Sequence, residues 1–376
     1  MVSQVLSHNF STANRALGYN SSQSKAYFST ALKKIKEDCS ESKKILSKYI
    51  ETSKANDLIR YITEVPSLKS NYYYRPSETS LPRAFHFNND RIFVHLTHSK
   101  EKDPNIGNGS SKKVKLAVDL ISGKLFADAS IRSEKLAKLE IEASKKLQGA
   151  AGFSLLEDWI KYPSKSNLHI SKYRLLSEYC NRGTLEGCIP FLSQDDKLEI
   201  MKQLINSLSK MHVEYGLVHR DLKSRNILIH VEDDKIKVKI CDLESVCDIS
   251  HPDIRKVGTP HYWSPEFADA YLDPYRTKLA NFVITEKHDI WALGCILYEM
   301  LSGEAKLPWE AANEKEIEKC IQKIAELREG WLSIQKSPSK LEELLQKMLQ
   351  IDPEKRISLK EAIKLLELEE MNSGTV

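Results

Sequence analysis

The stretch Val218–Ile229, VHRDLKSRNILI, decides the fold of this chain. Five basic, acidic or amide side chains fall within eight of its residues, between two apolar flanks. They are His219, Arg220, Asp221, Lys223 and Asn226. A helical pattern precedes the stretch and a strand pattern follows it, which is typical of a catalytic loop held by rigid elements. The alternative is a solvated polar loop, which would not require these residue types in this order.

The stretch resembles the catalytic loop of protein kinases, H-R-D-L-x-x-x-N, with every fixed position matched. The resemblance implies that Asp221 accepts or orients the proton of the substrate hydroxyl, while Lys223 steadies the γ-phosphate. Asn226 would hold a metal ion, and Arg220 would bind a phosphate or an acid on the activation loop. A lysine at position 223 is more typical of Ser/Thr kinases than of tyrosine kinases.

A second motif begins sixteen residues after Asn226. Asp242-Leu243-Glu244 stands where the kinase family has D-F-G, so the metal-binding aspartate is present. Glu244 replaces a glycine, which would either restrict the backbone or bring an extra acid near the metal ions. The segment that follows ends in Ser264-Pro265-Glu266, which resembles the A-P-E motif, and Thr259 matches the threonine of the substrate groove.

Two residues further along are implied to be structural. Asp289 is expected to brace the backbone of the catalytic loop, and Arg356 is expected to pair with Glu266. Ser245 and Ser250 are either regulatory phosphorylation sites or ordinary loop serines.

Glycines and strand-like runs precede the catalytic loop. Gly107-Asn108-Gly109 comes before two runs, 114–118 and 124–129, that are joined by a Ser122-Gly123 turn. A Gly-x-Gly lets backbone N–H groups approach phosphates. This region resembles the Gly-rich loop of kinases and the two strands after it. The implied ATP-binding residues are Ile106, Gly107, Asn108, Gly109, Val114 and Ala127, with Glu178, Cys180 and Leu228 further along the chain.

The small-lobe motifs depart from the family at the lysine of V-A-I-K, which falls on Ala129. That lysine normally holds the α- and β-phosphates and pairs with a helix glutamate, for which Glu140 in the helical pattern 134–147 is the best match. With-no-lysine kinases supply the ammonium from the third-glycine position instead, and Lys112 stands there. Lys112 is therefore a candidate catalytic residue. The alternative is a surface lysine in a pseudokinase that binds no nucleotide.

Two segments connect these motifs. Residues 155–160 predict a short helix, and residues 169–178 predict strands. The second segment enters YRLLSEYCNRGTLEGCI, residues 173–189, which resembles the hinge between kinase lobes. Ser177 takes the gatekeeper position there, and the backbone from Glu178 to Cys180 is implied to meet the adenine edge.

The first 83 residues differ from the rest in composition and in hydrophobic pattern. Residues 1–30 are rich in Ser, Asn and Ala, whereas residues 30–64 repeat apolar positions every three to four residues, which predicts one or two amphipathic helices. Pro66, Pro76 and Pro82 indicate a linker over 65–83. We predict an N-terminal helical extension and linker over 1–83 and a protein kinase-like domain over 84–370. The helices would dock either on the kinase domain or on a partner.

The overall composition limits which partners and which cellular compartment we expect for the protein. Lys and Arg exceed Asp and Glu by 56 − 52 = 4, without charged blocks, so no nucleic-acid partner is predicted. Seven cysteines without a C-x-x-C pair indicate reduced thiols. The N-terminus lacks an apolar signal segment, and no stretch approaches the ~20 residues of an integral membrane segment. We expect a cytoplasmic protein, with a secreted effector as the alternative.

The resemblance extends from about residue 91 to about residue 366. It implies an α+β, two-lobed protein-kinase-like fold with a β-rich N-lobe and a helical C-lobe, plus the N-terminal helical extension. The implied activity is transfer of the γ-phosphoryl group of ATP, with Mg²⁺ or Mn²⁺, to a protein substrate. Because of Ala129 and Glu244, the alternative is a pseudokinase that acts as a scaffold or allosteric regulator. A third hypothesis is transfer to a hydroxyl that is not on a protein.

Overall fold

The computed structural model describes residues 34–35, 37–64, 84–87, 91–96, 105–108, 112–163, 171–250, 258–275, 277–280, 282–310, 316–332 and 338–367. The chain divides into two compact units. The first unit comprises Met1–Ala137 and Leu156–Tyr179, and the second comprises Lys138–Leu155 and Cys180–Val376. The residues 1–30, the proline-containing linker and Gly109 lie outside the described residues.

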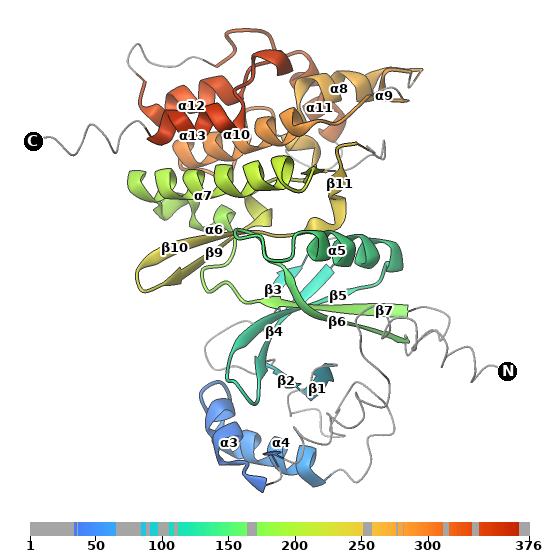
Figure 1. The fold of residues 1–376 in the computed structure, drawn as a ribbon, viewed down its shortest axis with the longest axis vertical. Helices are drawn as coiled ribbons and strands as arrows, with labels where there is room; N and C mark the ends of the chain where they lie inside the picture. Colours follow the sequence, from blue (N-terminus) through green and yellow to red (C-terminus); the bar gives the residue numbers. More distant parts are fainter. Residues whose placement is uncertain are drawn as a thin grey trace, which may run out of the picture. The chain divides into compact units, whose positions relative to one another are not determined.

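The first unit is built around an antiparallel sheet, whose described part has seven strands. The strands are β1 (Ala84–Phe87), β2 (Arg91–His95), β3 (Asn105–Asn108), β4 (Lys112–Asp119), β5 (Leu125–Ile131), β6 (Leu156–Pro163) and β7 (Ser171–Glu178). Their order is β1-β2-β4-β5-β7-β6, and β3 pairs with β4 beside this path (Figure 1). The predicted β4–β5 hairpin is confirmed, and Gly123 in its turn has φ 71°, which glycine adopts without a Cβ clash.

The prediction of a helix over 155–160 is wrong, because this segment begins strand β6. Residues Leu156–Pro163 pair with β7 through most of their length, and a register shift occurs between Leu156 and Asp158. A short apolar run carries no period that separates a strand from a helix, so the pairing partner decides its state. Trp159 and Ile160 also suit a strand, because aromatic and β-branched side chains pack well on a pleated surface.

Two N-terminal helices pack on the sheet of the first unit. They are α3 (Ser40–Ser47) and α4 (Thr52–Glu64), drawn in blue in Figure 1. Their apolar faces join side chains of β2 and β4 in one buried core, which we call the N-terminal cluster. Its buried members are Ile35, Ile45, Leu46, Ile50, Ala55, Leu58, Ile59, Ile62, Ile92, Val94, Leu96, Leu116, Val118 and Leu120. The predicted amphipathic helices are therefore present in this part of the chain.

Helix α5 (Glu134–Lys146) begins in the first unit and continues in the second. The other helices of the second unit are α6 (Leu185–Cys188), α7 (Gln194–Val213), α8 (Pro265–Leu272), α9 (Thr277–Ala280), α10 (Glu286–Ser302), α11 (Ile317–Ala325), α12 (Lys340–Met348) and α13 (Leu359–Glu367). Two small sheets accompany them, β8 (Leu217–Val218) with β11 (Cys247–Asp248) and β9 (Ile227–Glu232) with β10 (Lys235–Ile240). Helices α7 and α10 supply much of the buried core of this unit.

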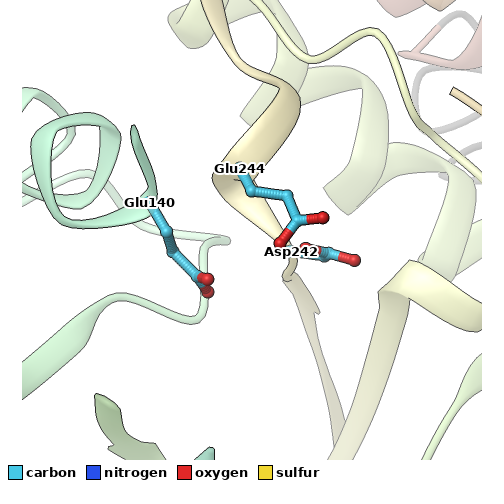
Figure 2. Close-up of side chains that lie close together, drawn as sticks. All are labelled: Glu140, Asp242 and Glu244. Carbon is cyan, nitrogen blue, oxygen red and sulfur yellow. The ribbon is translucent and has the colours of Figure 1, made fainter. Parts of the chain in front are cut away.

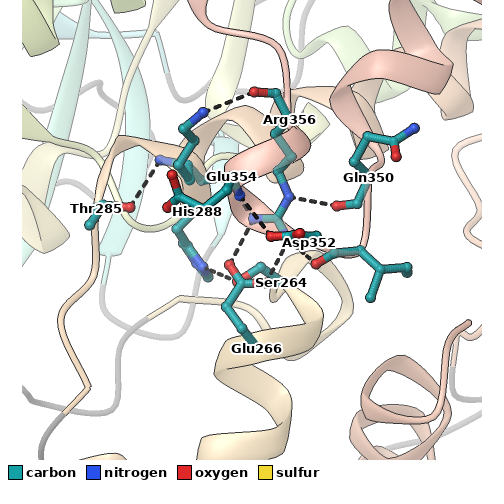
Figure 3. A network of polar contacts seen from close by, with 10 residues as sticks. Ser264, Glu266, Thr285, His288, Gln350, Asp352, Glu354 and Arg356 are labelled. Carbon is teal, nitrogen blue, oxygen red and sulfur yellow. Dashed lines mark hydrogen bonds and ion pairs between the residues drawn. The ribbon is translucent and has the colours of Figure 1, made fainter. Parts of the chain in front are cut away.

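The predicted ion pair between Arg356 and Glu266 is present at the end of residues 242–266, which we call the activation segment. The Arg356 guanidinium donates from two nitrogens to the Glu266 carboxylate, at 2.7 and 2.5 Å (Figure 3). Arg356 also donates to backbone carbonyls, including that of Gln350 at 2.8 Å. Next to this pair, the Ser264 hydroxyl lies 2.9 Å from Nδ1 of His288 on α10. These contacts attach the start of α8 to α10 and to the segment before α13.

The predicted fold class is confirmed: the first unit is β-rich, the second is mostly helical, and helices precede the sheet. All seven cysteines carry free thiols. No helix among the described residues combines the length and apolarity that crossing a lipid bilayer requires.

Candidate active site

The side chains of Asp221, Lys223 and Thr259, all in the second unit, form a triangle of hydrogen bonds. The Thr259 hydroxyl donates to Asp221 Oδ1 at 2.8 Å. Lys223 Nζ donates to Asp221 Oδ2 at 2.8 Å and to the Thr259 hydroxyl at 2.7 Å. All three residues are half-buried, so the triangle is reachable from solvent yet fixed on all sides by charge-assisted bonds. The structure thus brings together the predicted base, the predicted phosphate-binding lysine and the threonine of the activation segment.

Asp289 holds the backbone of the loop, which confirms its predicted role. The fully buried carboxylate accepts from the backbone N–H of His219 at 2.7 Å and of Arg220 at 2.9 Å. It also lies 2.9 Å from Nε2 of His212. Burial alone would raise the pKa of Asp289, but its bond to His212 and the charges of His212 and His219 lower that pKa to about 2. Asp289 therefore stays charged near neutral pH, and it holds the loop by charge-assisted hydrogen bonds.

Arg220 is expected to meet a phosphate or an acid, and the structure gives it a carbonyl partner. The residue is 2% exposed, and its guanidinium donates from Nε to the Ser245 carbonyl at 2.5 Å. Its backbone has φ 68°, in the left-handed region that costs energy for a residue with a Cβ. Such strain persists where surrounding contacts over-determine the backbone, here the bonds to Asp289.

Oxygen atoms suited to a hard divalent cation gather near the catalytic loop. The Asn226 side-chain N–H donates to the Asp221 carbonyl at 2.8 Å, which leaves the amide oxygen of Asn226 as its ligand atom. The backbone of Asp242 has φ 66°, so it too lies in the left-handed region that is strained for a residue other than glycine. Carboxylate oxygens of Glu140, Asp242 and Glu244 lie within 4.8 Å of one another (Figure 2). Carboxylate and amide oxygens are the ligands that Mg²⁺ and Mn²⁺ prefer, so the donor set fits such an ion.

Sequence reasoning anticipated only part of this carboxylate group. It identified Asp242 as a metal ligand, and for Glu244 it gave either a restricted backbone or an extra acid near the metal ions. It assigned Glu140 to a lysine partner, which Ala129 cannot provide. Glu140 and Asp242 are about one hundred positions apart, and no local signal in the sequence indicates that their carboxylates meet.

The pairing register of strands β4 and β5 determines on which face of the sheet Lys112 lies. Lys112 pairs with Ile131 and Val114 pairs with Ala129 across the β4–β5 ladder. Since alternate residues share a face, Lys112 and Val114 lie on the same face as Ala127 and Ala129. Lys113 pairs with Ser130 and Lys115 pairs with Asp128, so these two lysines belong to the opposite face. Lys112 is thus the diagonal neighbour of Ala129 on the adjacent strand.

The remaining predicted ATP-binding residues are distributed over both units. Ile106, Gly107 and Asn108 form most of β3, which ends before the undescribed Gly109. Glu178 is the exposed last residue of β7. In the second unit, Cys180 is buried, and Leu228 is half-buried on β9, where it bridges Thr184.

A buried polar chain behind the catalytic loop was not foreseen from the sequence. The Tyr262 hydroxyl donates to Glu299 Oε1 at 2.7 Å and lies 3.2 Å from the Ser224 hydroxyl. Burial raises the pKa of Glu299 to about 7 and also raises the pKa of Tyr262. Glu299 stands among apolar residues in the sequence of α10, and a glutamate at such a position indicates a buried polar partner. The sequence does not identify Tyr262 as that partner.

Comparison with known proteins gives one matching family model and a set of curated relatives. The family model described as "Protein kinase domain" matches residues 100–365. The serine/threonine-protein kinase PKH2 of Candida albicans is 30% identical over 279 residues, which is 68% of this chain and 26% of the relative. The serine/threonine-protein kinase cds1 of Schizosaccharomyces pombe is 29% identical over 269 residues, or 69% of this chain and 56% of the relative.

A third relative, mouse NUAK family SNF1-like kinase 1, is 27% identical over 289 residues, or 71% of this chain and 38% of the relative. The chain thus spans between about a quarter and just over half of the length of these relatives.

Proposed function

The chain belongs to the protein kinase domain family, of the eukaryotic Ser/Thr type, and on this premise we propose that it transfers the γ-phosphoryl group of MgATP to a protein hydroxyl. The observation that carries the proposal is the triangle of Asp221, Lys223 and Thr259, with contacts of 2.7 to 2.8 Å. Phosphoryl transfer requires positioned groups and electrostatic stabilisation more than covalent chemistry, and this triangle supplies both.

Each member of the triangle has a proposed role. Asp221 orients the substrate hydroxyl and accepts its proton, since its carboxylate is half-buried and is not neutralised by a bidentate arginine. Lys223 supplies a positive charge beside the hydroxyl, where negative charge develops on the transferred phosphoryl group. The Thr259 hydroxyl ties the activation segment to both residues, so that an ordered segment accompanies a correctly oriented base.

Asn226 and Asp242 are proposed to hold the Mg²⁺ or Mn²⁺ ion, since their oxygen donors fit a hard cation. When bound, the ion would neutralise phosphate charge. Glu244 adds a carboxylate to this donor set at the position of the family's glycine. Asn226 Nδ2 donates to the Asp221 carbonyl and to Asp221 Oδ2, and these two bonds fix the orientation of the amide and of its oxygen.

Residues of the first unit are proposed to hold the nucleotide. Lys112 would supply the ammonium that Ala129 lacks, which is supported by the register that gives both residues one face. Ile106, Gly107, Asn108, Gly109, Val114 and Ala127 would contact the nucleotide there. Glu178, Cys180 and Leu228 complete the proposed adenine contacts.

The test is incubation of the purified chain with labelled ATP, Mg²⁺ or Mn²⁺ and a basic protein substrate. The proposal is supported if the wild type labels the protein substrate and Asp221→Asn does not. Transfer that is absent from the wild type, or that is equal in Asp221→Asn, refutes it. Label that appears only on a small-molecule hydroxyl would favour transfer to a hydroxyl that is not on a protein.

A second candidate function is that of a pseudokinase scaffold or allosteric regulator. It is favoured by Ala129, which cannot hold phosphates, and by Glu244, which adds negative charge beside Asp242. Thermal unfolding with and without MgATP separates the two functions, because a ligand of the folded state raises apparent stability. A wild-type chain without any MgATP-dependent stabilisation would favour the scaffold.

A further inference from the structure

The N-terminal helices lie before the part of the chain that matches the kinase family model. Helices α3 and α4 end at Glu64, whereas the match begins at residue 100. Helices of 8 and 13 residues are marginal in water by themselves, so their packing must hold them. Leu58, Ile59 and Ile62 of α4 are 0–1% exposed, which shows that the N-terminal cluster covers this face of the helix completely.

The position of α3 is fixed against the β4–β5 hairpin by a polar contact as well as by packing. The buried Ser42 hydroxyl donates to the Leu120 carbonyl, at the end of β4, at 3.1 Å. The Ile45 side chain of α3 faces the turn of the hairpin, because a side chain at position 123 would meet it at 3.5 Å. This hairpin is the one that carries Lys112, Val114, Ala127 and Ala129.

Two residues at the edge of the N-terminal cluster connect it to the proposed nucleotide contacts. Ile106 and Tyr179 are partly buried and pack against the cluster. Ile106 lies at a register shift in β3, between the pairs Asn105–Lys115 and Gly107–Val114 of the ladder. Strand β3 has four residues and, among the described strands, pairs with β4 alone, so side-chain packing must contribute strongly to its position. Tyr179 directly follows Glu178.

We propose that α3 and α4 position strand β3 and the Glu178–Tyr179 segment for nucleotide binding, through the packing of Ile106 and Tyr179 on the N-terminal cluster. This inference rests on the proposed function. The residues of α3 and α4 are positioning residues that do not touch the nucleotide. Loosening the cluster lets β3 and the segment after β7 shift, so the Michaelis constant for ATP rises while the turnover number, which depends on the triangle around Asp221, stays nearly unchanged.

The experiment compares two isoleucine truncations in the full chain. Ile59→Ala opens a cavity in the N-terminal cluster, where Ile59 is 1% exposed. Ile160→Ala opens a cavity in the separate core of Phe93, Ala117, Phe126 and Leu176, where Ile160 is 3% exposed. The two variants lose the same atoms from buried sites of one unit, so a general loss of stability affects both. Initial rates of transfer over a range of MgATP concentrations give the Michaelis constant and the turnover number for each.

The expected result is a Michaelis constant for ATP at least about fivefold higher in Ile59→Ala, with the turnover number and the Ile160→Ala constants within about twofold of wild type. Ile59→Val, which leaves a smaller cavity, should restore most of the affinity. Equal effects of the two alanine variants, or no effect of either, would overturn the inference. If Ile59→Ala does not fold, Ile59→Val and Ile160→Val are compared instead. The Michaelis constant for ATP should then rise more in Ile59→Val than in Ile160→Val, and equal constants would overturn the inference.

Failure of the proposed function gives a different result. A wild-type chain that neither transfers phosphate nor gains thermal stability from MgATP would refute nucleotide binding itself. A wild-type chain that binds MgATP while the isoleucine variants bind it equally well would refute only the positioning role of α3 and α4.

Discussion

Replacement of Lys112 by alanine tests whether this lysine does the work of the residue missing at position 129. The β4–β5 register makes Lys112 the diagonal neighbour of Ala129 on the same face of the sheet. Diagonal neighbours are ~7–8 Å apart, a distance that the flexible four-carbon stem of lysine bridges. We therefore expect its ammonium to reach the region that a lysine at position 129 would serve.

The magnitude follows from the charge that is lost. An ammonium about 4 Å from a phosphate charge, at an effective dielectric constant of ~20, contributes about 4 kcal/mol. This corresponds to roughly a thousandfold in rate when the contact acts on the transition state. Deletion of one preorganised electrostatic partner costs ~10²–10³ in other enzymes, so we expect Lys112→Ala to lower kcat/KM for ATP within that range.

The chain offers matched controls for this assay. Lys113 and Lys115 carry the same charge on the same strand, but their side chains belong to the opposite face. Steady-state transfer with labelled MgATP should therefore stay within about threefold of wild type in Lys113→Ala and Lys115→Ala. The double variant Lys112→Ala with Ala129→Lys should recover activity, because it returns the ammonium to the same face. Equal losses in all three single variants, or full activity of Lys112→Ala, would refute the assignment.

Three further predictions concern the second unit. Arg356→Ala should lower the free energy of unfolding by roughly 3–5 kcal/mol in urea titrations, because it leaves the Glu266 carboxylate buried and unpaired; a loss below ~1 kcal/mol would contradict this. Burial raises the pKa of Glu299 from 4.5 to about 7, so the folded state holds its proton to a higher pH than the unfolded state does. The free energy of unfolding should therefore fall by roughly 3 kcal/mol as the pH rises through this interval. Glu299→Gln should remove this slope from the pH profile of urea unfolding, and an unchanged slope would assign it to another group. Removal of divalent cations by a chelator should abolish transfer reversibly, and Asp242→Asn should not be rescued by excess Mg²⁺; metal-independent transfer would contradict the proposed role of Asp242.

Much of the second unit was predictable because its signals are local. The spacing of His219 to Asn226 specifies a loop, and the apolar periods around it specify the helix before it and the strand after it. The segment at residues 156–163 shows where this approach fails. Its apolar residues fit a short helix or a strand, and only pairing with β7, which lies fifteen or so positions away, made it strand β6.

Contacts across long stretches of chain needed the tertiary structure. The carboxylates of Glu140, Asp242 and Glu244 meet within 4.8 Å, and the Tyr262 hydroxyl reaches Glu299 on α10. Packing of α3 and α4 on β2 and β4 likewise depends on which faces meet, whereas the amphipathic period predicts only that each helix has an apolar face.

The amino-acid sequence by itself determined the family, the loop with Asp221, Lys223 and Asn226, and the absence of a lysine at position 129, because these are properties of residue type and spacing. The tertiary structure decided which of three neighbouring lysines lies on the same sheet face as Ala129. Side chains alternate between the faces of a sheet, so a slip of one residue in the β4–β5 register would exchange Lys112 for Lys113. That register depends on the packing of the whole sheet, which no local pattern in the chain specifies.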